Sequence, residues 1–415
     1  MNVGSAPRAT SPASPAGPAL PEIGVIAVVA ERWGGMWLSR HQILTRLARY
    51  FQVVWYNPPR PLRSMLHAPA DRVDPTQPPG AGFDVYDHSR WLPKFYRPGA
   101  LRRAAERARL RQARRILERA GAKRIILYLW QPKFAEVLDL ADYDVSCYHI
   151  ADEYSFSDVE QPLSATERLV IERVDQVFVH SPALLEKKGR INPNTSYVAN
   201  GVDYASFAQP APEPPDLARI AHPRIGYIGR LKSQLDWHSL AEIAARRPDW
   251  SIVLVGPVGH MGASAPHKDA LLARPNVHYL GNRTVREIPA YTQHMDVCLL
   301  CYALTDYTRY IFPLKLHEYL AAGRPVVGAD LRTLHDFEHV VAIAHDPGQW
   351  VSAIEGALSP AERTPERVEE RRRVARAYDW NTLTERIAAA LCDRLGEDFP
   401  TRLATAGEQA RGYQP

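Results

Sequence analysis

One pattern recurs along this chain: a short apolar run, a polar turn, and then a stretch with helical spacing. The first half opens with IGVIAVVA (23–30), a turn holding Gly34 and Gly35, and then MWLSRHQILTRLARY. The second half opens in the same way, with RIGYIG (224–229) followed by WHSLAEIAARR. Apolar strands that alternate with helices are typical of a parallel sheet covered on both faces. The repeat therefore predicts an α/β protein with two doubly wound domains facing a cleft.

The length of the chain agrees with this division, because 415 residues exceed one ordinary hydrophobic core. The Pro-rich run AQPAPEPPDLARIAHP has the composition of a linker between domains. A second Pro-rich stretch, from Pro58 to Pro98, predicts an irregular excursion. The predicted organisation is a disordered tail (1–20), a first domain (21–207), the linker (208–223), a second domain (224–375), a final helix (376–396) and a second tail (397–415).

Several classes of protein are disfavoured by what the sequence lacks. No run approaches the roughly 20 apolar residues of a membrane span, and the first 21 residues lack the apolar centre of a signal peptide. We therefore expect a cytoplasmic protein. Cys298 and Cys301 form a C-x-x-C inside the apolar run MDVCLLCYAL, with no second Cys/His pair at zinc-ligand spacing. We expect buried core cysteines, no metal site and no cofactor.

The stretch FPLKLHEYLAAGRPVVGAD (312–330) places Lys315 and Glu318 three residues apart at the start of a predicted helix. Positions three apart lie on one helix face, so the pair is either a solvated ion pair or part of a site. In open parallel sheets, ligands bind beyond the carboxyl ends of the strands. Neither half has the G-x-G-x-x-G or P-loop pattern there, which disfavours classical NAD binding and P-loop chemistry.

Together, four segments of the second half resemble glycosyltransferases of the GT-B fold, especially family 4 and its bacterial polysaccharide relatives. They are IGYIGRL, SIVLVGPVG, NVHYLGNRTVREIPAYTQHMDVCLLCY and PLKLHEYLAAGRPVVGAD. YVANGVDYASF (197–207) resembles the close of that family's first domain, and YDWNTLTERIAAAL (378–391) resembles its terminal helix, which crosses back to the first domain. The resemblance covers residues 22–395 and implies two Rossmann-like domains. It also implies that the first domain binds the acceptor and that the second domain binds the nucleotide sugar.

The resemblance also gives roles to single residues. Lys315 would meet a phosphate and Glu318 the two ribose hydroxyls, while the helix start, with Pro313 and no capping side chain before it, could face an anion. Arg230 matches the family's Gly-Arg, whose Arg neutralises the departing diphosphate. Asn282 and Arg283 match the loop that holds the base. Gly34 and Gly35 would allow close approach of the backbone to donor or acceptor.

The chain departs from the family at two positions. The family's companion Lys usually follows the Arg by five residues, where Leu235 stands, so Lys232 is the candidate substitute. Retaining members carry a Glu eight positions before Glu318, and here that residue is Tyr310. Retaining and inverting transfer therefore both stay open.

An inverting transfer needs a carboxylate that takes the proton of the acceptor hydroxyl. Asp152 and Glu153 follow the predicted strand DVSCYHI, and related inverting transferases carry a similar acidic pair after this strand. The alternative is that Asp152 caps a helix. His41 and His180 are further candidate bases, although either could be an ordinary hydrogen-bonded core histidine.

The resemblance implies a glycosyltransferase of hexosyltransferase type that needs no metal. It would transfer a sugar from UDP, or else from GDP, to a glycan or lipid-linked acceptor in bacterial surface polysaccharide assembly. Two rivals remain: a nucleotide-sugar epimerase on the same fold, and a non-catalytic glycosyltransferase-like subunit.

The segment 100–124 is strongly basic. It carries ten Lys/Arg and two Glu, so its charge of +8 compares with +5 for the whole chain and leaves −3 elsewhere. An apolar stripe of small and medium residues is predicted beside the arginines: Leu101, Ala105, Leu110, Ala113, Ile116, Leu117 and Ala120. A basic amphipathic helix of this kind fits the inner face of an anionic cytoplasmic membrane. Nucleic acid is not expected, because no aromatic residues are interleaved.

Overall fold

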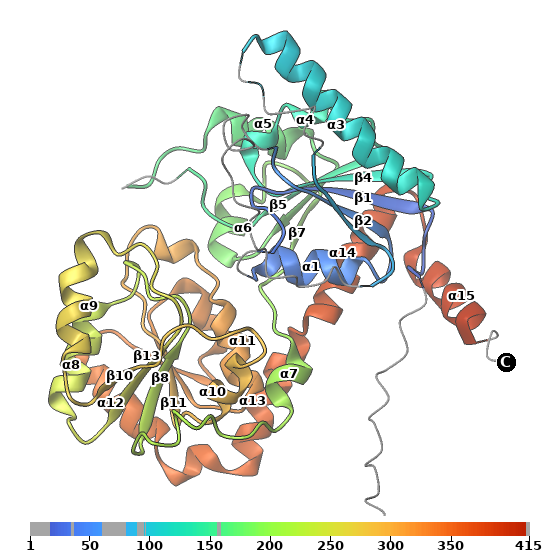
Figure 1. Ribbon diagram of the computed structural model, residues 1–415. Helices are drawn as coiled ribbons and strands as arrows, with labels where there is room; N and C mark the ends of the chain where they lie inside the picture. The colour runs from blue at the N-terminus through green and yellow to red at the C-terminus, as the bar shows by residue number, and fades with distance from the viewer. Residues whose placement is uncertain are drawn as a thin grey trace, which may run out of the picture.

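The computed structural model describes residues 17–34, 37–59, 80–88, 95, 97–155 and 159–411, with 406–411 given by their backbone alone. It contains two separate parallel sheets, each covered by helices on both faces (Figure 1). The strand orders are β3-β2-β1-β4-β5-β6-β7 and β10-β9-β8-β11-β12-β13. In each sheet the order reverses beside the first strand, between β1 and β4 and between β8 and β11. These are the places where doubly wound sheets bind ligands. The predicted fold of two doubly wound α/β sheets is confirmed.

The first sheet is built from strands of the first half. Its strands are β1 (Ile23–Val28), β2 (Gln52–Tyr56), β3 (Phe83–Tyr86), β4 (Arg124–Leu129), β5 (Val145–Ile150), β6 (Gln176–Val179) and β7 (Thr195–Tyr197). Its helices are α1 (Ser39–Leu47), α3 (Gly99–Arg119), α4 (Val137–Leu140), α5 (Ala165–Arg173) and α6 (Pro182–Lys188).

The second sheet follows a segment that runs from α7 (Tyr204–Ala208) to Arg224 with no strand in it. Its strands are β8 (Arg224–Ile228), β9 (Ser251–Val255), β10 (Val277–Tyr279), β11 (Val297–Leu300), β12 (Val326–Ala329) and β13 (Val341–Ala344). Its helices are α8 (Trp237–Arg246), α9 (Ala265–Leu272), α10 (Ile288–Gln293), α11 (Leu314–Ala321), α12 (Pro347–Ala357) and α13 (Pro365–Ala377).

The core follows from the alternation of side chains along each strand. In β1, Ile23 and Val25 belong to one buried cluster, and Ile26 and Val28 belong to another on the opposite face of the sheet. Both faces of the strand are therefore apolar, which is the composition of a central parallel strand. The four cysteines are buried and free, as the sequence predicted.

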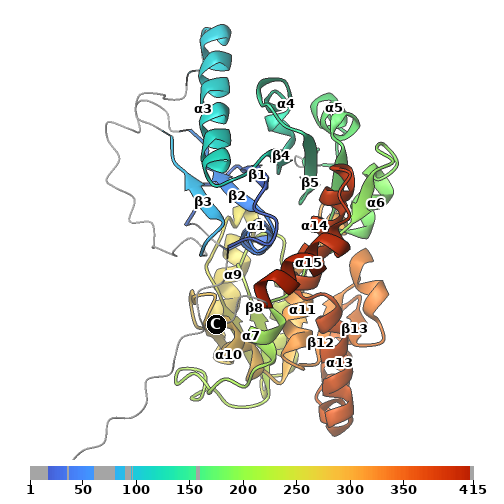
Figure 2. The same cartoon turned by 90° about the vertical axis from the view of Figure 1, so that its right-hand side faces the viewer.

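Helix α14 (Trp380–Arg394) belongs in space to the first sheet, although it follows the second in the chain (Figure 2). It contacts α1, β5 and β6, and Trp380, Ile387 and Leu391 lie in the same buried cluster as Ile23 and Val25 of β1. The chain continues as α15 (Phe399–Arg411), inside the stretch 397–415 that was predicted to be a tail. Phe399 is buried against the ring of Tyr50, and this contact anchors the extra helix.

The basic helix α3 differs from its prediction. Most of the predicted apolar stripe faces the protein, since Ala105, Leu110, Ala113 and Leu117 are buried and the helix contacts β1 and β2. This stripe covers one face of the first sheet, so it cannot insert into a bilayer. The Pro-rich stretch also differs, because β3 lies within it as the edge strand of the first sheet. Residues 60–79, 89–94 and 96 of that stretch lie outside the described part of the chain.

Candidate active site

Glycines follow the central strands of the second sheet and bring their ends close together. Gly229 and Gly256, directly after β8 and β9, have φ angles of +152° and +136°. A Cβ on Gly256 would lie 2.3 Å from the carbonyl oxygen of Gly229, and a Cβ on Gly229 would lie 1.8 Å from Cε of Lys315. Only glycine permits this approach, which lays the Lys315 side chain across the end of β8.

A pocket of about 850 Å³ opens at these strand ends, between the two halves of the molecule. All six donor-site residues predicted in the second half line it: Arg230, Lys232, Asn282, Arg283, Lys315 and Glu318. Residues of α1, including Gln42 and Arg46, line it from the first half, together with Trp380 of α14. The volume is within the range of sites that hold small molecules and cofactors.

Three cations gather on the second-half wall of this pocket. Lys232 interacts electrostatically with both Lys315 and Arg230, and none of the three forms an ion pair with a carboxylate in the described part of the chain. Burial, followed by repulsion from Lys315 and Arg230, lowers the pKa of Lys232 to about 8. Three neighbouring cations without a paired anion are the arrangement expected of a site for a multiply charged anion.

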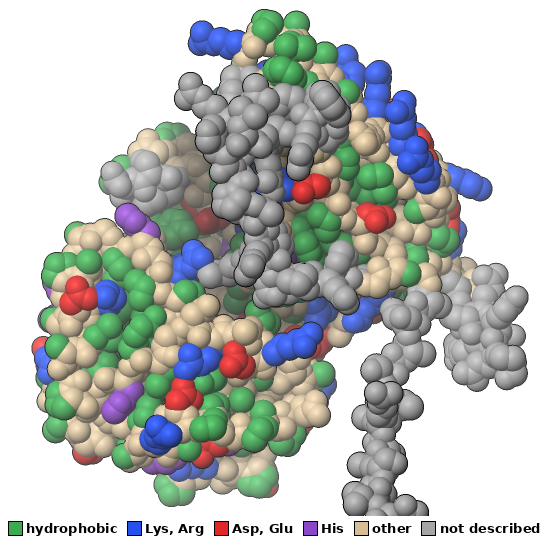
Figure 3. Space-filling view, in the orientation of Figure 1, with side chains coloured by type: hydrophobic (Ala, Val, Ile, Leu, Met, Phe, Trp, Pro, Cys, Tyr) green, Lys and Arg blue, Asp and Glu red, His purple; other side chains and the backbone are tan. Residues whose placement is uncertain are grey.

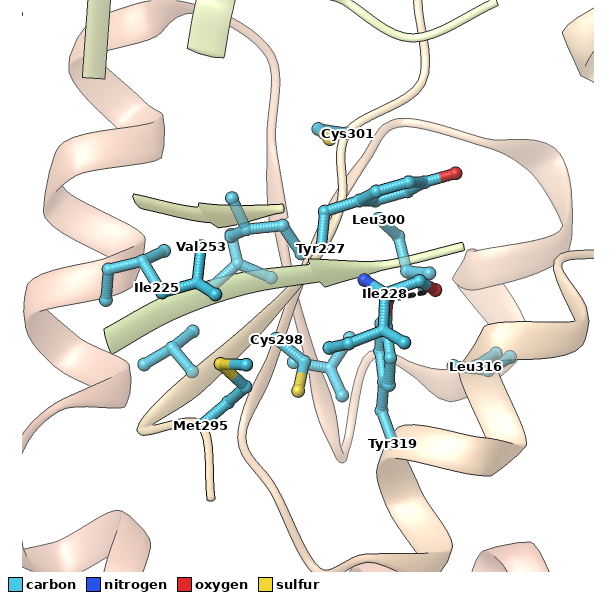
Figure 4. Close-up of a cluster of buried hydrophobic side chains, with 14 of the residues drawn as sticks. Ile225, Tyr227, Ile228, Val253, Met295, Cys298, Leu300, Cys301, Leu316 and Tyr319 are labelled. Atoms are coloured by element: carbon cyan, nitrogen blue, oxygen red, sulfur yellow. Dashed lines mark hydrogen bonds between the residues drawn. The ribbon is translucent and has the colours of Figure 1, made fainter. Parts of the chain in front are cut away.

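Two tyrosine hydroxyls hold the loop and the helix that carry these cations, and Figure 4 shows Tyr319 beside Ile228. Tyr319 of α11 accepts a hydrogen bond from the backbone N–H of Ile228 (2.9 Å) and donates one to its carbonyl (3.2 Å). Tyr227 of β8 donates to the carbonyl of Arg230 at 3.1 Å. The end of β8, the Arg230 loop and the start of α11 are therefore fixed to one another.

Glu318 lies one turn into α11, half-buried in the pocket wall. Burial raises the pKa of its carboxyl, while Lys315 opposes this shift. Its carboxylate accepts no hydrogen bond from the residues that the structure describes, so it can accept bonds from a ligand. Helix α11 begins after Pro313 with no side-chain cap, and Leu314 and Lys315 of its first turn line the pocket.

Contacts of Arg283 hold the loop that is predicted to bind the base of the nucleotide. Arg283 donates to the hydroxyl of Tyr291 at 2.6 Å and forms an ion pair with Asp216. Asn282 is exposed at the pocket rim. The guanidinium of Arg283 therefore holds the loop in place. The polar group that the loop exposes at the pocket is the side-chain amide of Asn282.

The two departures from the family have structural explanations. Leu235 is 2% exposed in the core of the second sheet, whereas Lys232 reaches the pocket, so this geometry favours Lys232 as the second cation. Tyr310 points away from the pocket and packs in a buried cluster of the first half, where its hydroxyl donates to Glu160 at 2.6 Å. Tyr310 therefore forms a contact between the two halves of the molecule.

The acidic pair after β5 divides into one exposed and one buried carboxylate. Asp152 is exposed, interacts electrostatically with Lys232, and accepts a hydrogen bond from Tyr307 of the second half at 3.0 Å. It does not cap the next helix, α5, since Ser164 does so. Glu153 is buried beside the equally buried ammonium of Lys188, 3.1 Å away. The geometry therefore favours Asp152 over Glu153 as a group that a substrate can reach.

Asp152 and Glu153 do not line the pocket, and neither do the remaining candidates in the described part of the chain. His41 is buried against the rings of Trp37 and Trp55, and burial lowers its pKa to about 4. His180 is buried and hydrogen-bonded to the carbonyl of Ile150 at 2.9 Å, and burial lowers its pKa. Gly34 has a φ of +94°, as a tight turn after β1 requires, and does not line the pocket. Gly35 lies outside the described residues.

Sequence reasoning missed Tyr307 and the wall contributed by α1. Arg46 lines the pocket and also contacts Asp203 (3.4 Å) and Asn381 (3.2 Å), which come from distant parts of the chain. Burial lowers the pKa of Arg46. No local pattern marks such residues, because helical spacing alone does not tell which polar side of α1 faces a cleft.

Comparison with known proteins relates this chain to a family. Residues 222–359 match the family model described as glycosyl transferases group 1. The chain is 30% identical over 291 residues to TuaH of Bacillus subtilis (strain 168), which carries the name of a teichuronic acid biosynthesis glycosyltransferase. This match covers 65% of the chain and 72% of TuaH.

A second relative is the phosphatidyl-myo-inositol mannosyltransferase of Propionibacterium freudenreichii, 25% identical over 202 residues that cover 46% of this chain and 49% of that protein. Among solved structures, one from E. coli, described as trehalose-6-phosphate bound with UDP-2-fluoro glucose, superposes with a TM-score of 0.61 at 14% identity. This superposition covers 89% of the chain and 98% of that structure.

The fold and the match to TuaH define the class of protein: a GT-B glycosyltransferase, for which a nucleotide-sugar donor is implied. The chain belongs to the group 1 glycosyltransferases. None of the helices in the described part of the chain combines the length and the apolar character that crossing a membrane demands.

Proposed function

We propose that this protein transfers a sugar from a nucleoside diphosphate donor, preferably UDP, to a glycan or lipid-linked acceptor in bacterial surface polysaccharide assembly. The observation that carries the proposal is the group of three cations without paired anions at the switch point of the second sheet. The name of TuaH supports the polysaccharide part, and the UDP-sugar bound in the E. coli structure supports the donor.

The donor would lie with its diphosphate against Arg230, Lys232 and Lys315 and the N-terminus of α11. As the bond between the anomeric carbon and the diphosphate breaks, the negative charge that develops on the leaving oxygen is stabilised by these cations. Glu318 would accept both ribose hydroxyls, and Asn282 would meet the base. The transfer needs no metal in this scheme, because the protein supplies the positive charge.

The acceptor side is assigned to the first half. In an inverting transfer, the hydroxyl of the acceptor attacks the anomeric carbon, its proton passes to Asp152, and the nucleoside diphosphate leaves. Tyr310 supports this choice, because a retaining member of the family would have a Glu at that position, whereas the tyrosine hydroxyl is bound to Glu160. The anomeric configuration of the product, determined by NMR, tests the assignment. A configuration inverted relative to the donor supports it, and a retained configuration contradicts it.

The nucleotide can be identified without knowing the acceptor. A thermal-shift panel of UDP, GDP and ADP with their common sugars should give the largest stabilisation with UDP or with one UDP-sugar. Stabilisation by none of these ligands would contradict the donor site.

The two rival functions predict different products. An epimerase would convert the selected UDP-sugar to its epimer with no acceptor present, so epimerised sugar nucleotide would overturn transfer. A non-catalytic subunit would bind nucleotide and yet release no UDP with any acceptor.

The acceptor class suggests where the enzyme works: on the inner face of the cytoplasmic membrane, bound peripherally. Exposed arginines recur every fourth residue along α3, at Arg103, Arg107, Arg111, Arg115 and Arg119. Lys and Arg side chains gather along the outer edge of the molecule over this helix (Figure 3). Since the apolar stripe is buried, attachment would be electrostatic and would weaken with salt.

Co-sedimentation with anionic vesicles tests this attachment. Changing Arg107, Arg111, Arg115 and Arg119 to Gln should abolish binding. The same change of Arg219, Arg246, Arg373 and Arg376, which are exposed on the second half, should not. Equal binding by both variants would exclude α3 as the attachment surface.

A further inference from the structure

One of the contacts between the two halves is made by a short segment that precedes α11. Its 3₁₀ turn, Thr308–Tyr310, contacts α6 of the first half. Tyr307 donates to both carboxylate oxygens of Asp152, at 3.0 Å and 3.2 Å. Tyr310 donates to Glu160 at 2.6 Å, and the side chain of Arg309 donates to the hydroxyl of Tyr310 at 2.7 Å. Residues 307–310 are called the tyrosine segment below.

The two tyrosines of the tyrosine segment contact different kinds of carboxylate. Glu160 is also paired with Lys187 at 2.6 Å, and the ammonium of Lys187 lies 4.9 Å from the centre of the Tyr310 ring. This is a closed contact between buried and half-buried groups. Asp152 is exposed, lies outside the pocket lining, and interacts electrostatically with one pocket cation, Lys232. The bond from Tyr307 is thus made to the carboxylate proposed as the base.

We propose that Tyr307 is a positioning residue, which orients the carboxylate of Asp152 toward the acceptor only when the two halves of the enzyme are closed. The proposal rests on the proposed function, because it requires Asp152 to be the base. It adds a residue of the second half to the catalytic arrangement of the first.

The geometry around Asp152 explains how the orientation would be imposed. Its Oδ1 accepts the backbone N–H of Glu153 at 2.8 Å and the hydroxyl of Tyr307 at 3.0 Å. These two donors come from opposite sides of the cleft and fix the plane of the carboxylate. Oδ2 receives only the longer branch of the Tyr307 bond among the described residues, so it is the oxygen that can take the proton of the acceptor.

Closure and base position are linked by this bond. Tyr307 is on the same connection as α11, which carries Lys315 and Glu318. A donor that draws α11 toward the cleft would carry the hydroxyl of Tyr307 with it. In an opened molecule Asp152 would lose the bond and rotate freely, so the base would be aligned only after the donor has bound.

A double-mutant cycle tests the proposal, with release of UDP from the preferred UDP-sugar, water serving as acceptor, as the measured reaction. Tyr307→Phe should lower kcat about 10–100-fold, the effect of losing a hydrogen bond to a charged group, and leave the affinity for UDP within about twofold. In the Asp152→Asn background, the same substitution should cost less than about threefold, because the group through which Tyr307 acts is already lost.

Tyr310→Phe is the matched control. It removes a bond across the same interface, to Glu160, and none to Asp152. Its effect, whatever its size, should be the same in the wild-type and Asp152→Asn backgrounds.

The outcomes separate the two claims. If Asp152→Asn is fully active, the proposed base fails and this inference fails with it. If Asp152→Asn is impaired while Tyr307→Phe is normal, or costs the same in both backgrounds, the base stands and the positioning role is wrong.

Discussion

The low pKa of Lys232 makes donor binding a proton-coupled event. Its pKa is lowered to about 8, well below that of a free lysine, which corresponds to about 3 kcal/mol against its charged form. The causes are burial and two neighbouring cations, and a bound diphosphate opposes both. Binding should therefore return the pKa of Lys232 to its usual range or above.

The sign follows from the two protonation states. A pKa of about 8 predicts that about half of the Lys232 side chains are neutral in the free enzyme at pH 8. In the complex nearly all should be protonated, so about half a proton is taken up for each UDP bound, and the uptake should shrink as the pH falls below 7. Affinity for UDP should weaken as the pH rises from 8 to 10.

Calorimetric titration of UDP in two buffers of different ionisation enthalpy measures this uptake directly. Lys232→Met is the control, because it removes the titrating group and keeps an unbranched chain in the wall. The reasoning is refuted if wild-type enzyme takes up no proton at pH 8, or if Lys232→Met takes up as much as wild type.

Three further outcomes follow from the site. Asp152→Asn should lower turnover by ~10²–10⁴-fold with UDP affinity unchanged, and normal turnover would place the base elsewhere. Glu153→Gln should lower the stability of the fold, because it weakens the contact with the buried Lys188. We expect a loss of about 1–3 kcal/mol, measured as a lower Tm. A variant that is stable but inactive would show that Glu153, and not Asp152, is the base. Gly229→Ala should displace Lys315 and weaken UDP binding by about tenfold or more. The control is Gly356→Ala, whose new Cβ has nothing within 4 Å and which should leave UDP binding unchanged. Equal UDP affinities of the two variants would show that Lys315 is not held at the end of β8.

The sequence was sufficient for features that are encoded locally. Buried parallel strands are apolar on both faces, so β1, β8 and β11 are visible as continuous runs. Arg230 directly follows β8, at the edge where the ends of parallel strands meet, and the resemblance to the family added Lys315 and Glu318 to the same predicted site.

Features that depend on distant partners could not be predicted. Glu153 and Lys188 are 35 residues apart, and Tyr307 lies 155 residues from Asp152, so no spacing rule connects them. The stripe on α3 was visible, but an amphipathic pattern does not say whether a sheet or a membrane covers it. Strand β3 has four residues and lies in a Pro-rich stretch, where the alternation is too short to be recognised.

The central claim is that the three cations and Glu318 hold a nucleoside diphosphate. Its most direct test is the affinity for UDP of Arg230→Ala, Lys315→Ala and Glu318→Ala, with Arg219→Ala on the outer surface as control and Tm recorded for each variant. We expect each of the three to weaken binding by on the order of 1.5–3 kcal/mol with an unchanged Tm, as for a lost charged hydrogen bond. Wild-type affinity for UDP and GDP in all three would contradict the account.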